Sequence, residues 1–379
     1  MRHLPREAYI SQNWLEKEQT DLFADAWVFA GVESDFKQAG DYTTLQVGAF
    51  PLVILQMKDG TLAAFHNLCR HRGTTLLEGQ GNTGKSIVCP YHRWTYMLDG
   101  RLKGVPDMAT CFPDFERADH GLKPASVAVF QGLVFVNAKP KADFESWIAP
   151  IKDKVWPHNL EAKDISEAAS LTYEMKCNWK VFVENAIDGY HLAYLHEQTL
   201  GGPKADENIW ERYGPHLLWY ATDSEDMRHA LPAKSRKEFK KAWTAPLKDA
   251  AKKSFAGVYY LFPTTLITAT PYSFTLSTLS SDTAGTSRMI ARNWVGPWQK
   301  KDDRKYIPGY DAETGIISSD NWTQPALDTG DFQTEDVWIC EKIQQGLNSP
   351  AFELGQLAQG AGAEDPIGWF HESLLARLP

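Results

Sequence analysis

The stretch "NLCRHRGTTLLEGQGNTGKSIVCPYHRW", numbered 67–94, contains two close-set Cys-His pairs. Cys69 and His71 form the first pair, Cys89 and His92 form the second, and 17 residues separate the pairs. Two thiols and two imidazoles at such short spacings are typical of metal ligands. Short apolar runs and turn dipeptides flank the stretch, so we expect each pair to lie in a loop between β-strands.

Two kinds of metal centre fit these four side chains. The first is a structural zinc site, in which two cysteines and two histidines complete a tetrahedron. The second is a [2Fe–2S] cluster with two cysteines on one iron and two histidines on the other. Zinc fingers place both histidines in one helix, after both cysteines, whereas here each loop supplies one residue of each type. This order favours a cluster held between two similar loops.

The two loops resemble a known motif. "CRHRG", followed by "CPYHRWTYMLDGRL", resembles the Rieske motif of the Rieske non-heme iron oxygenases. The resemblance implies that Cys69 and Cys89 bind one iron of the cluster, while His71 and His92 bind the other. The chain departs from the motif at Arg93, where the family usually has glycine. This change leaves the ligands intact, but a charge there can shift the cluster's potential or the docking of an electron donor.

The residues around the motif predict a small all-β domain. Residues 40–138 read as successive short strands, with hairpin turns expected at Asp59-Gly60, Asp99-Gly100 and Gln131-Gly132. Residues 1–39 instead space apolar residues three and four apart, which predicts helix. We expect this N-terminal helical segment to pack with the catalytic domain.

The remaining residues, 139–379, predict a larger mixed domain. A meander of strands is expected over 255–297, which is rich in Thr, Tyr, Ile and Phe. Helical patterns occur near 178–195, 230–253 and 331–347. The fold class expected for the whole chain is therefore α+β, with an antiparallel sheet covered by helices in the larger domain. The family resemblance implies that this catalytic domain is helix-grip-like.

A second group of metal-binding side chains lies in "NWKVFVENAIDGYHLAYLHE", residues 178–197. His191 and His196 are five residues apart, so on a regular helix they would point about 140° from each other. A distorted turn or a helix break near Ala193 would be needed to bring both to one ion. Non-heme Fe(II) oxygenases use two histidines and one carboxylate, which leaves positions open for O₂. Taken alone, a pair of histidines is more often found at the surface or in core packing than at a metal.

The same stretch resembles the catalytic helix of the Rieske oxygenases, which implies that His191 and His196 bind a mononuclear iron. The third ligand is expected far downstream, in "FQTEDVWICEKIQQGLNS", residues 332–349. This segment resembles the family's Glu-Asp pair before a Glu-x-x-Gln helix. The resemblance favours Asp336 as the carboxylate ligand, with Glu335 as the runner-up.

Asp188 precedes His191 by three residues and is not needed as a ligand. In the family, the matching aspartate links a Rieske histidine of one subunit to an iron-binding histidine of its neighbour. The resemblance therefore implies that Asp188 serves catalysis by passing electrons between subunits. It also implies a ring of subunits, which is a homotrimer or a multiple of it, with or without a β subunit.

The resemblance implies a terminal oxygenase that uses O₂ and electrons from NAD(P)H. A separate reductase, with or without a ferredoxin, has to supply these electrons, because "GQGNTG" at residues 79–84 opens no helix and is no dinucleotide loop. A Rieske electron-transfer protein is the alternative of another class. It would bind one type of iron centre only, and the residues 188–196 argue against it.

For the substrate, "DGYHLAYLH" is similar to ring hydroxylases of benzoate-like acids, so an aromatic acid is the main expectation. The alternative is a monooxygenase or demethylase of a betaine-like or carnitine-like quaternary ammonium compound, which the N-terminal segment resembles. Carnitine-type members, however, carry Glu at the position of Asp188.

Arg288 and Arg292 are candidates to bind a substrate carboxylate. Candidate aromatic pocket residues, for which burial in the core is the alternative, are Trp219, Tyr259, Phe262, Tyr272, Phe274 and Trp294.

Composition limits the other function classes. The net charge of −9 over 379 residues argues against a nucleic-acid partner. The start of the chain has no apolar secretion signal, and no run approaches the 18 apolar residues of a membrane helix. Five cysteines, an odd number, favour reduced thiols over a disulfide framework. We therefore expect a cytoplasmic enzyme without a membrane partner.

Overall fold

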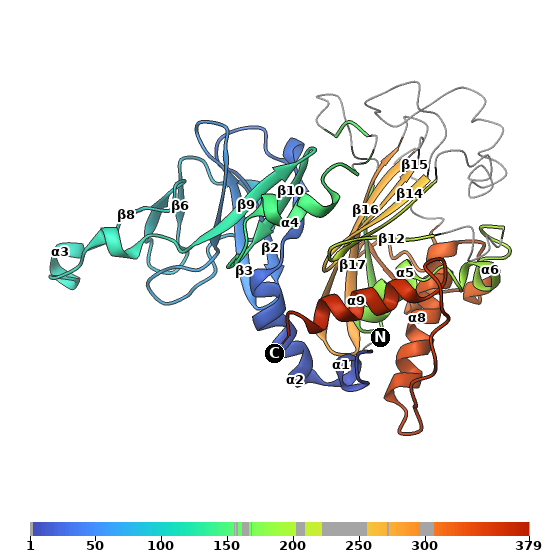
Figure 1. The fold of residues 1–379 in the computed structure, drawn as a ribbon. Coiled ribbons are helices and arrows are strands. Elements are labelled where there is room, and N and C mark those ends of the chain that lie inside the picture. The colour runs from blue at the N-terminus through green and yellow to red at the C-terminus, as the bar shows by residue number, and fades with distance from the viewer. Residues whose placement is uncertain are drawn as a thin grey trace. The chain divides into compact units, whose positions relative to one another are not determined.

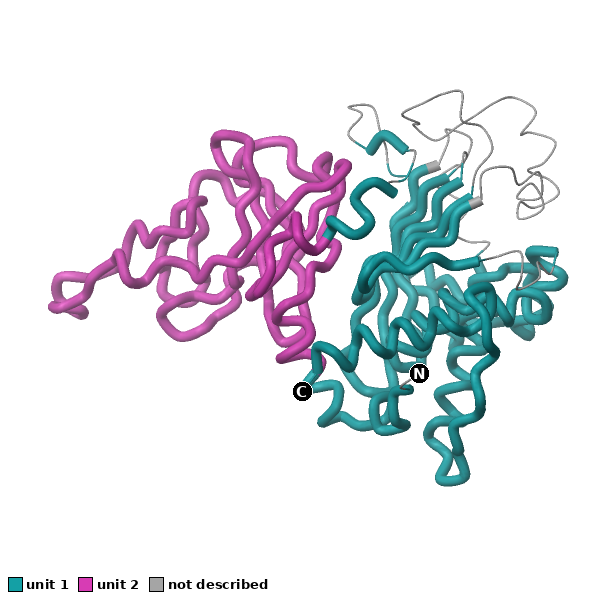
Figure 2. The backbone as a smooth tube through the Cα atoms, in the orientation of Figure 1, with its two compact units in different colours: residues 1–17, 148–379 teal, residues 18–147 magenta. Residues whose placement is uncertain are grey.

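The computed structural model describes residues 3–154, 156, 158–160, 167, 169–201, 209–221, 256–270, 273–295 and 307–378. Figure 1 shows the fold, and Figure 2 shows that the chain divides into two compact units. Unit 1 comprises residues 1–17 and 148–379, and unit 2 comprises residues 18–147. The helical pattern expected over 230–253 lies outside the described residues.

Unit 2 contains the two Cys-His loops and is built almost entirely from antiparallel strands. A seven-stranded sheet has the order β1-β10-β9-β4-β3-β2-β5, and a three-stranded sheet has the order β6-β7-β8. The strands are β1 (Val28–Val32), β2 (Asp41–Val47), β3 (Phe50–Gln56), β4 (Leu62–His66), β5 (Gln80–Asn82), β6 (Ser86–Val88), β7 (Thr95–Met97), β8 (Leu102–Gly104), β9 (Pro124–Phe130) and β10 (Leu133–Asn137).

The three expected hairpin turns are all present in unit 2. They connect β3 to β4, β7 to β8 and β9 to β10. In the last of these turns Gln131 and Gly132 both have positive φ, 54° and 81°, as a two-residue hairpin loop requires. The unit also contains two short α-helices, α3 (Met108–Cys111) and most of α4 (Phe144–Ile148). Short 3₁₀ or π-helical segments occur in it as well, at η1 (Glu18–Leu22), η2 (Phe23–Asp25), η3 (Glu33–Asp35) and η4 (Arg117–His120).

The boundaries between the two units differ from the domain boundaries that the sequence pattern predicted. We expected an N-terminal segment of residues 1–39, and only residues 1–17 group with unit 1. Residues 18–39 belong to unit 2 because β1 pairs with β10, which adds an edge strand to the seven-stranded sheet. At the other end, unit 2 runs on to residue 147 rather than 138, as the Phe144 ring packs on Phe135 of β10.

Unit 1 is centred on an eight-stranded sheet of order β12-β13-β14-β15-β16-β17-β11-β18. All pairs are antiparallel except β11 with β18. The strands are β11 (Ala169–Met175), β12 (Glu211–Tyr213), β13 (His216–Ala221), β14 (Ala256–Leu261), β15 (Thr265–Thr270), β16 (Ser273–Thr283), β17 (Thr286–Val295) and β18 (Ile316–Ser318). The meander expected over 255–297 corresponds to β14–β17.

Helices lie beside this sheet in unit 1, as Figure 1 shows. They are α1 (Glu7–Ile10), α2 (Gln12–Lys17), α5 (Trp179–Ile187), α6 (Leu192–Leu195), α8 (Phe332–Asn348) and α9 (Asp365–Leu375). Helix α5 contacts β16 and β17 on one side and packs against α8 and α9. The expected α+β class, an all-β part plus an antiparallel sheet with helices, is confirmed. Among the described residues, no helix is both long and apolar enough to cross a membrane.

The candidate pocket aromatics are mostly core residues of unit 1. Tyr259, Phe262, Phe274 and Trp294 are each at most 2% exposed. Their burial supports the alternative that they pack the sheet. Trp219 is half-buried on β13, and Tyr272 lies outside the described residues.

Candidate metal centres

His191, His196 and Asp336 come together in unit 1. The Nε2 atom of His196 lies 3.0 Å from Oδ1 of Asp336, and Nε2 of His191 lies 3.7 Å from the same oxygen. One ligand atom from each residue lies within 4.8 Å of the other two. Two imidazole nitrogens and one carboxylate oxygen, all aimed at one point, form a donor set suited to a non-heme iron.

The helix that carries this stretch ends before the first histidine, at a different place from the break that we expected. Helix α5 ends at Ile187, and Asp188 takes an extended conformation with φ −85° and ψ 119°. The Asp188 carboxylate accepts the backbone N–H of Tyr190 at 2.6 Å, which stabilises the turn. The break therefore precedes His191, whereas we had expected it near Ala193 between the two histidines.

Each of the two histidines is held from its other side by a carboxylate. Nδ1 of His191 donates to Oδ2 of Asp188 at 3.1 Å, and Nδ1 of His196 donates to Oε2 of Glu335 at 2.7 Å. Because a carboxylate accepts but does not donate, both Nδ1 atoms carry the proton in the neutral rings. Nε2 of His196 also faces a carboxylate, that of Asp336, so it can bind a metal ion only after it has released its proton. A carboxylate behind Nδ1 is the usual arrangement for ligating histidines.

Glu335 therefore does not fit the ligand role for which it was the runner-up. It is 2% exposed and lies against Nδ1 of His196, away from the convergent ligand atoms. Thr199 donates to the same carboxylate oxygen at 2.7 Å, and Asn185 donates to Oδ1 of Asp336 at 2.8 Å. No sequence pattern indicates a role for Asn185 or Thr199, because only the fold brings them to the site.

Electrostatics also favour a cation at this point. Burial lowers the pKa of His191, but hydrogen bonds with Asp188 and Asp336 outweigh burial and raise it to about 9. Burial raises the pKa of Asp336, and hydrogen bonds from His191 and His196 outweigh that effect and lower it to about 2. Imidazole protons thus neutralise the buried carboxylate when no metal is bound. A divalent cation can replace them, because metal ligands bind in their deprotonated form.

The four residues of the Cys-His loops meet in unit 2. Cys69 and Cys89 are buried and free of disulfides, and the rings of His71 and His92 lie 4.8 Å apart. Both histidines bury an Nδ1 atom that has no hydrogen-bond partner in the part of the chain the structure describes. Burial raises the pKa of the Cys69 thiol, so a thiolate there needs a positive charge beside it. Orphaned ring nitrogens beside two free thiols fit a bound [2Fe–2S] cluster.

The surroundings of these loops match a redox centre near a surface. The His71 ring stacks on Trp94 with centroids 4.8 Å apart, and Trp94 is buried. On the outer side, Arg72 and Tyr91 are exposed and hydrogen-bonded to each other at 3.1 Å. Arg93 is also exposed and has φ 61°, a left-handed conformation that explains why glycine suits this position.

Comparison with known proteins agrees with both centres. Residues 26–128 match the Rieske [2Fe–2S] domain, and residues 162–379 match the catalytic domain of the ring-hydroxylating alpha subunit. The second match alone covers more than half of the chain. The chain belongs to the ring-hydroxylating alpha subunit family. As an oxidoreductase of this Rieske oxygenase family it has a [2Fe–2S] domain and a catalytic domain for mononuclear iron, so the expected cofactors are confirmed.

Relatives of this Rieske oxygenase include several of nearly the same length. It is 28% identical over 407 aligned positions to the glycine betaine monooxygenase oxygenase subunit of Chromohalobacter salexigens, covering 99% of this chain and 86% of that one. It is 31% identical over 268 positions to the carnitine monooxygenase oxygenase subunit of Acinetobacter pittii, covering 68% and 71%. A quaternary ammonium Rieske monooxygenase of known structure has the same fold, with a TM-score of 0.75 at 23% identity and coverage of 100% and 95%.

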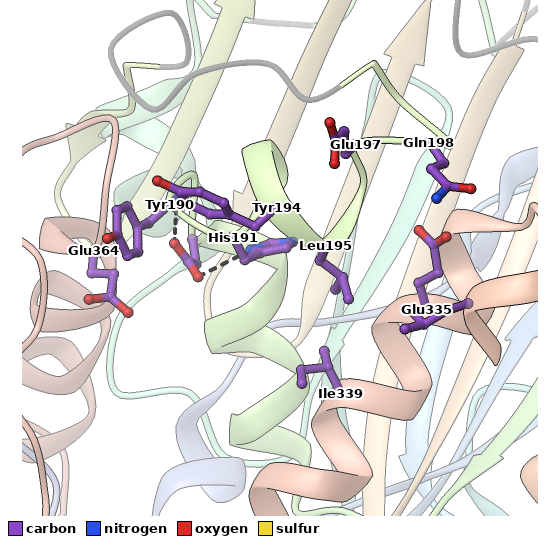
Figure 3. A pocket seen from close by; sticks show the side chains of 11 residues that line it. Tyr190, His191, Tyr194, Leu195, Glu197, Gln198, Glu335, Ile339 and Glu364 are labelled. Carbon is purple, nitrogen blue, oxygen red and sulfur yellow. Dashed lines mark hydrogen bonds and ion pairs between the residues drawn. The ribbon is translucent and has the colours of Figure 1, made fainter. Parts of the chain in front are cut away.

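A pocket of about 550 Å³ lies next to His191. Figure 3 shows the side chains that line it, which come from the turn after α5, from α6 and the residues that follow it, and from α8. Leu327 and Glu364, which precede α8 and α9, complete the lining. Asp188 and Glu335 line this pocket, whereas His196 and Asp336 do not. The pocket therefore reaches His191 and the carboxylates that hold the Nδ1 atoms of the two histidines.

The carboxylate behind His196 leads to a first prediction. We expect Glu335→Leu to weaken binding of the mononuclear iron by about 10-fold to 100-fold, because His196 loses the acceptor that fixes its ring and tautomer. Glu335→Gln keeps an acceptor oxygen, so its affinity for iron should lie between that of Glu335→Leu and that of the unchanged protein. Iron affinity is measured by chelator competition, with the visible spectrum of the cluster as the control for folding. Equal iron affinity in all three proteins would contradict this role.

Proposed function

We propose that this terminal Rieske oxygenase acts on a small quaternary ammonium compound, such as a betaine-like or carnitine-like molecule. The observation that carries the proposal is its similarity to the glycine betaine and carnitine monooxygenase subunits, one of them over 99% of the chain. This similarity favours the alternative in our sequence analysis over the aromatic acid that we took as the main expectation.

The arginines that we considered for an aromatic acid are engaged elsewhere. Arg288 donates to Glu174 at 2.7 Å, and its side chain is 47% exposed. Arg292 donates to Glu167 at 3.0 Å through Nε. An arginine already paired with a carboxylate has little capacity for the bidentate contact that a substrate carboxylate needs. This pairing leaves neither arginine available to bind a substrate carboxylate, whether that of an aromatic acid or that of a betaine, so the two arginines do not discriminate between the substrate classes.

The proposed reaction inserts one oxygen atom of O₂ into the substrate and releases the other as water. Two electrons, drawn from NAD(P)H through a separate reductase, and two protons complete the balance. The bound iron supplies the reductive activation of O₂, using positions that two histidines and one carboxylate leave open. We propose His191, His196 and Asp336 as its ligands. For the cluster, we propose Cys69, His71, Cys89 and His92.

Neighbouring side chains hold these ligands in place, and one of them is proposed to link the two metal centres for electron transfer. Glu335 fixes the ring of His196, and Asn185 orients the carboxylate of Asp336. We propose that Asp188, which holds His191 and lines the open pocket, accepts a second N–H bond from a cluster histidine of a neighbouring copy. A single carboxylate would then join the two centres across a subunit boundary, and the active form would be a ring, which we take to be a homotrimer.

A substrate screen tests the proposed substrate class. With a reductase and NAD(P)H, we expect trimethylammonium compounds such as glycine betaine and carnitine to support O₂ uptake at least about tenfold faster than benzoate or anthranilate. The mass of the product is measured by mass spectrometry after reaction in ¹⁸O₂, and we expect it to contain one ¹⁸O atom. An Asp336→Ala variant serves as the control for uptake unrelated to the iron. Coupled oxidation of the aromatic acids alone would contradict the proposal.

A further inference from the structure

Helices α1 and α9, which are far apart in sequence, both contact one carboxylate of helix α5, that of Glu184. Tyr9 in α1 donates its hydroxyl proton to Oε1 of Glu184 at 2.6 Å. Nε2 of His371 in α9 lies 2.9 Å from the same oxygen. Tyr9 and His371 are only 6% and 4% exposed, so water competes little for these contacts.

The backbone fixes the hydrogen-bonding role of His371. The N–H of Leu4 points to Nδ1 of the His371 ring at 3.3 Å. Because an N–H can only donate, Nδ1 has to be the acceptor, and the proton of the neutral ring is on Nε2. Nε2 therefore donates to Glu184, whose carboxylate receives one hydrogen bond from each of the two buried side chains.

Glu184 directly precedes Asn185, which reaches the proposed iron site. Nδ2 of Asn185 donates to Oδ1 of Asp336 at 2.8 Å, and Nε2 of His196 lies 3.0 Å from the same oxygen. The apolar packing of α5 is not directional, so alone it tolerates small rotations of the helix. A rotation of roughly 20° would move the tip of a side chain by roughly 2 Å, which breaks a hydrogen bond. Fixing Glu184 therefore also fixes the direction of Asn185.

The backbone of Tyr9 joins α5 to α8 as well. Its carbonyl oxygen accepts from Nδ2 of Asn178, the N-cap of α5, and from Nε2 of Gln344 in α8, both at 3.3 Å. Oε1 of Gln344 in turn accepts the backbone N–H of Asn178 at 2.8 Å. Residue 9 thus ties together the two helices that carry Asn185 and Asp336.

We propose that Tyr9 and His371 are positioning residues for the carboxylate that binds the mononuclear iron. They act through Glu184 and Asn185, and the inference rests on the proposed ligand role of Asp336. While both donors hold Glu184, Asn185 keeps the Asp336 carboxylate aimed at the point where the ligand atoms converge. When a donor is removed, this carboxylate can take more orientations, so iron binds less tightly and with a less uniform geometry.

The first test removes the Tyr9 hydroxyl from the full-length protein with its cluster bound. We expect Tyr9→Phe to weaken Fe(II) binding about threefold to tenfold in chelator competition, which is less than the effect of losing a direct partner of a ligand. The second readout is the EPR spectrum of the nitric oxide adduct of the mononuclear Fe(II), whose shape reports the geometry of the ligands. The cluster is kept oxidised, and thus EPR-silent. We expect the single signal of the unchanged protein to become a mixture of species in Tyr9→Phe.

Tyr260→Phe separates this role from a general loss of stability. Tyr260 is fully buried in the same unit, and its hydroxyl donates to the carbonyl of Pro263 at 2.7 Å. Loss of this hydroxyl should lower the thermal unfolding temperature about as much as Tyr9→Phe does, because each removes one buried hydrogen bond. Iron affinity and the EPR signal of Tyr260→Phe should not change. Equal losses of iron affinity in the two variants would overturn the inference, since Tyr9 would then only stabilise the fold.

His371 provides an independent test for the case in which Tyr9→Phe does not fold. His371→Leu removes the second donor, whereas His371→Gln keeps an N–H donor near the position of Nε2. We expect His371→Leu to weaken iron binding and His371→Gln to recover most of the affinity. Adding Tyr9→Phe to Glu184→Leu should have no further effect, because the hydroxyl acts through that carboxylate.

The outcomes distinguish this inference from the proposed function. Unchanged iron affinity and an unchanged EPR signal in Tyr9→Phe or in His371→Leu overturn the inference and leave the proposed function in place. Mononuclear iron that remains bound in Asp336→Ala would instead contradict the ligand set on which the inference rests.

Discussion

Asp336→Ala is expected to remove the mononuclear iron and to reduce substrate oxygenation by at least about a thousandfold, which is roughly 4 kcal/mol of barrier. Asp336 supplies the only carboxylate oxygen among the three convergent ligand atoms. Without it, two buried imidazoles face the iron with no negative charge to balance the cation, and a divalent iron binds weakly. The cluster in unit 2 has separate ligands, so its visible spectrum should persist.

The control for this variant is Asp320→Ala, which removes a carboxylate that is 69% exposed and paired with Lys176. It should retain iron and activity. The measurements are iron per chain, the cluster spectrum and product formed per NAD(P)H. An Asp336→Ala protein that keeps its mononuclear iron and its turnover would show that the ligand set is wrong.

Asp188→Asn is expected to keep both metal centres and to lower coupled turnover by at least about 100-fold. The change preserves shape but replaces one acceptor oxygen by an N–H donor. One oxygen of Asp188 already accepts from Tyr190, and the other accepts from His191. An asparagine cannot accept from both and also from a histidine of a neighbouring copy, so the proposed link between the centres is lost.

Glu197→Gln is the matched control for Asp188→Asn. It makes the same chemical change in an exposed side chain that lines the same pocket and is not hydrogen-bonded to the ligands in the described structure. Rapid-reaction measurements should show that the cluster of Asp188→Asn is reduced normally but is not reoxidised when substrate and O₂ are added. Normal reoxidation in Asp188→Asn would remove this aspartate from the electron path.

Mixed oligomers test whether that path crosses between copies. A copy without its cluster, through Cys89→Ala, is combined with a copy without its mononuclear iron, through Asp336→Ala. Each variant alone should be inactive. If electrons pass between neighbouring copies, the mixture regains activity, because a cluster of one copy serves the iron of the next. Mixed oligomers that stay inactive would favour transfer within one chain.

The four proposed cluster ligands could be recognised as a group because they lie close together in sequence. Cys69 and His92 span only 24 residues, and the loops between strands could be recognised from turn residues. Asp336 is 140 positions beyond His196, so only the family resemblance, and not the local pattern, indicated its approach to the histidines. Only the folded structure can distinguish Asp336 from Glu335 as the ligand, because neighbouring residues on a helix point about 100° apart. In α8 one faces Nε2 of His196 and the other faces Nδ1.

Other differences from the sequence analysis have causes that hydrophobic periodicity does not reveal. β1 was expected to be helical, and it is a strand because it pairs with β10, about a hundred residues later. The helix break at Asp188 arises from a carboxylate that caps the backbone of the next turn, a competition with helical hydrogen bonds that periodicity does not reveal.

The iron and acid-labile sulfide content of the purified protein tests the central claim most directly. A Rieske oxygenase whose two centres are both held within one chain should contain about three iron atoms and about two sulfides per chain. Asp336→Ala should lose about one iron and no sulfide. Two irons with two sulfides in the unchanged protein, or zinc without sulfide, would contradict the account.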